Sequence, residues 1–366
     1  MMRQLLSHDL PRNRWLAAAL LLIVIGLALA PFLFPGSKAL GVAAKMLVFI
    51  LLVASYDLLL GYTGIVSFAH TMFFGIGAYG VAIASDRLGG GWPAVALGTA
   101  LAMAASLSLS LVIGLFSLRV KAIFYAMITL AVAAAFQTLA SQLSEFTGGE
   151  DGLSFKNPTW LSPSFEPFGG AEAPLFGVSI DGKLLTYYLL FVATVVLFLL
   201  LLRIVNSPFG RVLQAIREND FRAEALGYRT VVYRTLSNVL SALFATAAGV
   251  LLALWLRYTG PDTTLSFEIM LDILLIVVIG GMGTMYGAVI GSVLFVLAQN
   301  YLQDLLKLAG GAFESVPLLG AVLTPDRWLL WLGVLFVLSV YHFPTGIVGR
   351  LRVLTTAKPP PQETDP

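Results

Sequence analysis

The sequence contains no cysteine among its 366 residues, and only 11% of its residues are charged. The first absence excludes disulfide bonds, a thiolate metal site and a cysteine nucleophile. The second lies far below the roughly 25% of charged residues that ordinary soluble domains carry. Apolar side chains make up 58% of the chain, which is more than a soluble core can enclose, so we expect lipid to surround the protein.

Several motifs that carry chemistry are also missing. No G-x-x-x-x-G-K-[ST] segment occurs, so the chain has no phosphate-binding loop of its own, and any ATP must be hydrolysed by a separate subunit. The three histidines lack metal-ligand spacing, and no Ser/His/Asp arrangement for nucleophilic catalysis can be assigned. No basic stripe interleaved with aromatics indicates nucleic-acid binding. We therefore expect no enzyme activity, no metal site and no cofactor bound by this chain.

Long apolar runs dominate instead. A helix needs about 20 apolar residues to cross the hydrocarbon core. The sequence supplies ten candidate spans: 16–35, 43–60, 63–84, 92–117, 122–142, 185–202, 235–256, 269–285, 287–306 and 327–344. Residues 28–30 (Ala-Leu-Ala) resemble a signal-peptide cleavage site. Because Pro31 follows directly and the apolar run continues to Phe34, we interpret this segment as an uncleaved first span.

The placement of basic residues predicts the orientation, because Lys and Arg favour the cytoplasmic side. With the N-terminus inside and ten crossings, 14 of the 22 basic residues lie inside: Arg3, Arg12, Arg14, Arg119, Lys121, Arg203, Arg211, Arg217, Arg222, Arg229, Arg234, Arg350, Arg352 and Lys358. The loop 203–234 is then cytoplasmic, and the mainly acidic loop 144–183 is periplasmic. We expect both termini in the cytoplasm, with a disordered, proline-rich tail over 358–366.

Charge is scarce within the predicted spans. The exceptions are Asp57, near the inner end of the second span, and Asp272, about one turn into the eighth span from outside. A buried charge costs about 2.5–3.5 kcal/mol or more and normally signals ion coupling, so its scarcity disfavours an ion-coupled carrier. Asp272 has two interpretations, a boundary carboxylate hydrated by external water or a group that attracts a cationic amino group. His70 is either a hydrogen-bonded structural residue or a ligand.

Ten spans divide into two halves of five with opposite topology. Transporters often contain such inverted repeats, and glycine-interrupted helices at matching positions mark their pathway. One glycine-rich tract runs from Gly61 to Gly80 in the third span, and the other runs from Gly280 to Gly291 at the end of the eighth. Residue identity between the tracts is negligible, so the repeat is inferred from topology. Each glycine is explained either by tight helix packing or by a broken or re-entrant element along the route.

The cytoplasmic loop contains an amphipathic pattern. Apolar residues at 212, 213, 216, 223 and 226 have helical spacing, and charged residues cover the other positions. Gly227 is a natural C-terminal stop. We therefore predict one or two short helices, which lie either on lipid head groups or, as the short apolar stripe and mixed charge favour, against a protein partner.

Four motifs, in order, resemble the LivM-type permeases of branched-chain amino-acid ABC transporters. The first is Gly61-Tyr62-Thr63-Gly64 with Ser67, His70, Phe73 and Gly77-Ala78-Tyr79. The others are Thr147-Gly148-Gly149-Glu150-Asp151-Gly152-Leu153, the stretch from Gly210-Arg211 to Leu226-Gly227, and Gly280-Gly281-Met282-Gly283-Thr284 with Gly287 and Gly291. The resemblance spans roughly residues 45–300. The chain departs from the family at residues 119–125, at Asp151 and in its long loop 154–182.

The resemblance implies a fold, a set of partners and two groups of site residues. The fold is an all-α integral membrane protein of about ten transmembrane helices in two inverted five-helix halves with glycine-broken segments, a permease domain over 1–357. The partners are a second, LivH-like permease, two LivG/LivF-like ATPase subunits, and a periplasmic or lipid-anchored solute-binding protein. Coupling to the ATPase is expected at Gly210, Arg211, Arg217, Glu218, Asp220, Ala223, Glu224, Leu226 and Gly227. The translocation pathway is expected at Gly61, Gly64, Ser67, His70, Gly77, Tyr79, Asp272, Gly280, Gly281, Gly283 and Thr284.

Other functions remain open at this point. Urea and amide permeases share the same framework, so the branched-chain or related small amino acid is an expectation rather than a deduction. An ion-coupled carrier would work without ATPase subunits. A membrane-embedded lipid transferase usually shows acidic or His clusters at the membrane face, which the sequence lacks. An ABC importer permease of the bacterial inner membrane fits these features best.

Overall fold

The computed structural model describes residues 14–34, 36–117, 122–165, 180–312 and 324–350. Almost all regular structure in this part of the chain is helical. The long helices are α2 (Arg14–Leu33), α3 (Ser37–Thr63), α4 (His70–Leu88), α5 (Trp92–Ser117), α6 (Ala122–Gln142), α8 (Gly182–Val205), α11 (Thr230–Leu256), α13 (Phe267–Gly280), α14 (Met285–Ala312) and α16 (Trp328–His342). The prediction of an all-α membrane protein is confirmed.

Short elements connect the long helices. They are α7 (Ser144–Thr147), η1 (Gly149–Asp151), β1 (Leu153–Ser154), η2 (Thr159–Leu161), α9 (Pro208–Glu218), α10 (Asp220–Ala225), β2 (Tyr258–Thr259), α12 (Pro261–Thr264) and η3 (Pro325–Arg327). The strands β1 and β2 pair antiparallel, with Leu153 opposite Thr259. The tail 358–366 and part of the predicted loop 144–183 lie outside the described residues.

Within the described residues, nine helical segments are long and apolar enough to cross a membrane. They correspond to nine of the ten predicted spans. The third predicted span, 63–84, was placed too early, because Gly64 takes a left-handed conformation (φ 73°) and ends α3. Residues 64–69 form an irregular break before α4 begins at His70. Gly61 to Gly64 therefore lie at the end of α3, and α4 is a buried helix with polar residues at both ends.

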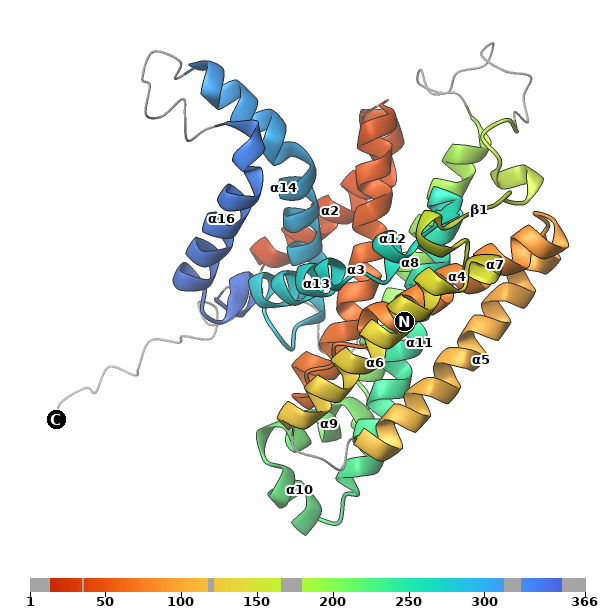
Figure 1. Ribbon diagram of the computed structural model, residues 1–366. Helices are drawn as coiled ribbons and strands as arrows, with labels where there is room; N and C mark the ends of the chain where they lie inside the picture. The colour runs from red at the N-terminus through yellow and green to blue at the C-terminus, as the bar shows by residue number, and fades with distance from the viewer. Residues whose placement is uncertain (1–13, 35, 118–121, 166–179, 313–323, 351–366) are drawn as a thin grey trace, which may run out of the picture.

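The helices α3 and α11 form the centre of the bundle, as Figure 1 shows, and the other long helices lie around them. In the most apolar stretches, 78% of α3 and 72% of α11 is buried inside the protein, against 17% of α2 and α6. The two central helices run antiparallel, since the Ser241 hydroxyl donates to the Ser55 carbonyl at 2.6 Å and Ser237 lies beside Thr63. The exposed apolar faces of the outer helices are suited to lipid.

The contacts between helices repeat when the two halves are exchanged. α3 packs antiparallel against α14, and α11 packs antiparallel against α5. α4 corresponds to α13: α4 packs against α11, and α13 packs against α3. α6 corresponds to α16: α6 packs against α4 and α5, and α16 packs against α13 and α14. Such exchanged contacts between antiparallel counterparts are what two halves of inverted topology produce.

Glycine allows α4 and α11 to touch at their backbones. A Cβ atom on Gly77 would lie 2.0 Å from the Thr246 carbonyl oxygen, and one on Gly249 would lie 1.9 Å from that of Phe74. No side chain larger than hydrogen fits at these two places unless the helices move apart. The structure thus places Gly77 at a tight helix contact.

Candidate functional site

The helices α9 and α10 lie together at one end of the bundle, which we call the α9 end (Figure 1). Pro208 occupies the first turn of α9, and the Ser207 side chain caps that turn by accepting from the Gly210 amide. Leu213 and Ile216 are buried against the bundle. Gly210 is required because a Cβ atom there would lie 1.9 Å from the Val205 carbonyl oxygen. Sequence and packing together hold α9 against the ends of the long helices.

The second short helix, α10, is fixed to the start of α11. The Asp220 carboxylate pairs with Arg234 at 3.0 Å, and the Thr230 hydroxyl donates to Glu224 at 2.6 Å. After α10, Gly227 has φ 92° in open space, and the Tyr228 amide donates back to the Ala223 carbonyl. The predicted pair of short helices and the predicted stop at Gly227 are confirmed.

The apolar stripe of this segment differs from the prediction at its end. Ala223 is buried as expected, but Leu226 is 72% exposed. Phe221, which the spacing did not single out, is 83% exposed, because α10 turns away from the axis of α9 after Asn219. The exposed charged positions Arg211 and Glu218 lie on α9. Phe221 on α10 and Leu226 directly after it thus leave two large apolar side chains uncovered at the α9 end.

Arg217 connects α9 to both glycine-rich tracts. Its guanidinium donates to the carbonyl of Gly61, at the end of α3, and its aliphatic part lies against Gly64. It also lies beside Gly283, in the turn between α13 and α14, so that a Cβ atom on that glycine would come 2.8 Å from the guanidinium. Three predicted motifs that are far apart in sequence therefore meet at one side chain.

Asp57 closes this junction from the other side. Its carboxylate accepts a hydrogen bond of 2.8 Å from the Gly283 amide. A carboxylate that is 1% exposed needs such partners, since burying it without them is costly. We name the contact of Asp57, Gly61, Arg217 and Gly283 the glycine junction. It links α3 of one half to the α13–α14 turn of the other.

The rest of the second glycine tract forms a tight turn. Gly281 has φ 112°, and the Thr284 hydroxyl donates to its carbonyl at 2.6 Å. A Cβ atom on Gly280 would lie 2.1 Å from the Gly287 carbonyl oxygen, so the backbones of α13 and α14 approach closely beside the turn. These glycines shape the turn that presents Gly283 to Arg217.

Ser67, His70 and Tyr79 are buried in the protein, each 5% exposed or less. His70 Nε2 lies 2.9 Å from the Ser55 hydroxyl and 3.3 Å from the Leu52 carbonyl oxygen, and the Ser67 hydroxyl accepts from the Ala69 amide. The Tyr79 hydroxyl has no hydrogen-bond partner among the described residues. His70 is thus a hydrogen-bonded residue that supports the break after α3.

Asp272 is not a simple boundary carboxylate. It is half-buried and accepts a hydrogen bond of 3.3 Å from Gln299, whose carbonyl accepts one of 2.8 Å from Lys45. Lys45 also interacts electrostatically with Asp272. The sequence analysis overlooked Lys45, although it lies inside the predicted second span, and Asp272 has no basic neighbour in sequence. The pairing depends on α3, α13 and α14 coming together.

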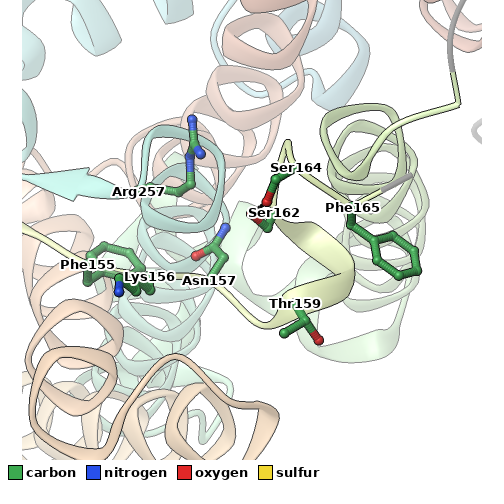
Figure 2. Close-up of a pocket in the computed structure, with 8 residues that line it drawn as sticks. All are labelled: Phe155, Lys156, Asn157, Thr159, Ser162, Ser164, Phe165 and Arg257. Carbon is green, nitrogen blue, oxygen red and sulfur yellow. Dashed lines mark hydrogen bonds between the residues drawn. The ribbon is translucent and has the colours of Figure 1, made fainter. Parts of the chain in front are cut away.

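A cavity of about 560 Å³ lies away from α9, at the opposite end of the bundle. Figure 2 shows the segment 155–165 around it, with Arg257 and Asn157 on one side and Ser162 and Ser164 on the other. Lys156 and Arg257 make its lining cationic, and no acidic residue lines it. Asn157 donates to the Leu254 carbonyl at 2.6 Å, which ties this loop to the end of α11.

Comparisons with known proteins identify the family of the chain. Residues 38–340 match the model of the family described as "Branched-chain amino acid transport system / permease component". The chain is 26% identical to the high-affinity branched-chain amino acid transport system permease protein LivM of Salmonella typhimurium, over 85% of this chain and 70% of that protein. The same identity and coverage hold for LivM of Escherichia coli.

Two further relatives are covered almost fully. The chain is 26% identical to a probable branched-chain amino acid transport permease protein LivM of Methanocaldococcus jannaschii, over 82% of this chain and 90% of that protein. It is 27% identical to the high-affinity branched-chain amino acid transport system permease protein BraD of Pseudomonas aeruginosa, over 83% of this chain and 92% of that protein. No solved structure matches the chain significantly. The chain belongs to the family of branched-chain amino acid transport system permease components.

Proposed function

We propose that this chain is the permease subunit of an ABC importer, and that it carries branched-chain or related small amino acids across the bacterial inner membrane. ATP is hydrolysed by separate LivG/LivF-like subunits, and a LivH-like permease completes the membrane part. The family description and the names of the relatives refer to branched-chain amino acid transport, which supports this class of solute. The geometry of Arg217 carries the mechanism, because it joins the short helices of the α9 end to both halves of the bundle.

The orientation belongs to the same proposal. The loop 203–234 and both termini face the cytoplasm, because most basic residues then lie inside. The α9 end meets the ATPase subunits through the exposed side chains of Phe221, on α10, and Leu226, directly after it. The cationic cavity at the opposite end faces the solute-binding protein.

The coupling step follows from the contacts at the glycine junction. When the ATPase subunits move α9, Arg217 pulls on the Gly61 carbonyl and on the turn that holds Gly283. Asp57 is bonded to the Gly283 amide, so α3 and the α13–α14 turn move together. A displacement at the surface is thereby passed to helices of both halves, which is what alternating access requires.

A matched pair of arginine substitutions tests this step. Arg217→Gln removes the guanidinium from the glycine junction. Arg222→Gln changes an exposed arginine of α10 whose side chain makes no hydrogen bond or ion pair among the described residues. In proteoliposomes with the complete transporter, we expect Arg217→Gln to lower ATP-driven leucine uptake about tenfold, the usual range of coupling between sites. ATP hydrolysis should continue, and Arg222→Gln should match the wild type. Normal uptake by Arg217→Gln would refute the coupling role.

A further inference from the structure

A second cavity lies between the two halves, beside the breaks that precede α4 and α13. Its volume is about 350 Å³, and its wall includes Phe68, Leu130, Leu265 and Phe267. Phe68 precedes α4, Phe267 begins α13, and α6, which crosses in front of α4 in Figure 1, supplies the outer wall of this partly open cavity. Binding sites for small ligands typically measure about 300–1,000 Å³. The cavity therefore has room for one small solute.

The two breaks stand at matching places in the two halves. The first, residues 64–69, separates α3 from α4, and the second, residues 257–266, separates α11 from α13. The rings of Phe68 and Phe267 lie 6.0 Å apart at an angle of 38°, so the breaks meet across the cavity. Discontinuous helices whose N-termini face a central site are a common way to bind a solute carboxylate within a membrane.

Two polar groups in the wall lack partners. Thr71 is only 2% exposed and lines the cavity, and its hydroxyl makes no hydrogen bond within the described part of the chain. The Gln137 amide lines the cavity from α6 and likewise has no partner among the described residues. No side chain caps the first turn of α4, where Thr71 lies. Buried polar groups are normally paired, so the unpaired Thr71 hydroxyl indicates a ligand that pairs with it, and the half-buried Gln137 amide lines the same cavity.

We propose that this cavity binds the transported solute as a zwitterionic amino acid with an aliphatic side chain, an inference that rests on the proposed function. The side chain lies against Phe68, Leu265 and Phe267. The carboxylate accepts from the Thr71 hydroxyl and from the first turn of α4, where the helix dipole favours negative charge. The ammonium group donates to the Gln137 carbonyl.

Other occupants fit the cavity less well. A lipid chain would leave Thr71 and Gln137 without partners, which is costly in an apolar site. A helix of a second permease is about 10–12 Å wide with its side chains, so it could cover the mouth of the cavity but would leave the space of about 350 Å³ behind it free. A small molecule with one apolar end and two polar groups can contact the apolar side chains of the cavity and hydrogen-bond to Thr71 and Gln137.

The test fills the cavity and compares two solutes. Ala134 lines it, and the neighbouring Ala135 is exposed on another side of α6 and does not line it. In the complete transporter in proteoliposomes, Ala134→Phe should lower the ratio of leucine to alanine uptake about tenfold, because it takes the room of the larger side chain. Ala135→Phe should leave the ratio unchanged. If Ala134→Phe does not assemble, Ala134→Leu should shift the ratio in the same direction.

A second variant tests the polar end. Thr71→Val keeps the shape of the side chain and removes its hydroxyl, so we expect the half-saturating concentration to rise about fivefold for leucine and alanine alike. Equal loss of both solutes in the Ala134 variants, an unchanged ratio, or loss of the co-purifying second permease would overturn the proposed solute site while leaving the transporter assignment intact. Absence of amino-acid uptake by the wild-type complex would instead refute the proposed function, and the solute site with it.

Discussion

Two antiparallel helix pairs hold equivalent places when the two halves are exchanged, yet different chemistry joins them. Each pair contains one helix of each half. The pair α3–α14 is joined by charged side chains, with Lys45 bonded to Gln299 and Lys38 paired with Asp304 at 2.7 Å. The pair α11–α5 is joined by neutral groups, with Thr246 donating to Ser106 at 2.6 Å and Asn238 to the Ser110 carbonyl. Equivalent packing therefore does not require the same residues.

The difference also predicts what each helix contact tolerates. The contacts of α3 with α13 and α14 should be sensitive to the loss of one charge, because the remaining charge is then left half-buried without its partner. The contacts of α11 with α4 and α5 should be sensitive to added volume, because α11 touches α4 at glycine backbones. Four sets of substitutions separate these two kinds of sensitivity.

The largest effect is expected at the glycine contact of α11 with α4. In Gly249→Ala, the new methyl group would meet the Phe74 carbonyl oxygen, a backbone atom that cannot move aside, so we expect a loss of about 3 kcal/mol or more. Thermal unfolding of the purified protein in detergent measures it. Gly26→Ala is the control, because its methyl group meets nothing within 4 Å. Equal unfolding temperatures for both variants would refute the tight contact.

The next largest effect concerns the charges between α3, α13 and α14. Asp272→Asn leaves Lys45 without its carboxylate, and we expect a loss of about 2 kcal/mol in the free energy of unfolding, reduced from the fully buried case by partial exposure. The double variant Lys45→Met with Asp272→Leu should recover most of this loss. A double-mutant cycle on unfolding free energies measures the coupling. Strictly additive losses would show that the two charges do not interact.

A smaller effect is expected for the neutral contact between α11 and α5. Thr246→Val keeps the side-chain shape and removes the hydrogen bond to Ser106, a change worth about 0.6 kcal/mol between membrane helices. Thr138→Val serves as the control, since the Thr138 hydroxyl bonds within its own helix. A loss as large as that of Asp272→Asn would contradict the contrast between the two helix pairs.

The smallest effect is expected at the exposed end of the α3–α14 pair. The side chains of Lys38 and Asp304 are 60% and 58% exposed, so Lys38→Ala should cost only about 0.2–0.5 kcal/mol. The loss should fade when salt is raised, because ions screen exposed charges. A loss that persists in high salt would mean that lipid or protein shields this pair.

The sequence predicted the helices better than the contacts between them. Apolar runs marked nine spans within a few residues of their helices, since lipid demands long uninterrupted helices. Gly227 was recognised as a stop because a left-handed residue after a short helix is usually glycine. The start of α4 was missed, because Gly64 could have continued an apolar run as easily as ended it.

Contacts between distant residues could not be read from the chain. The glycine motifs and Arg217 were each found separately, but their meeting at the glycine junction spans 156 residues from Gly61 to Arg217. The pairing of Lys45 with Gln299 spans 254 residues. Phe221 was overlooked because its exposure depends on the direction in which α10 leaves α9. Only the packed bundle determines these positions.

The central claim is that partner ATPase subunits drive this chain from the cytoplasm through α9 and α10. Since the chain has no cysteine, Phe221→Cys gives a unique and exposed thiol for a membrane-impermeant maleimide. The account predicts no labelling from outside intact cells, labelling in inverted vesicles stripped of the ATPase subunits, and protection when those subunits are bound. Labelling of this thiol from the outside of intact cells would contradict it.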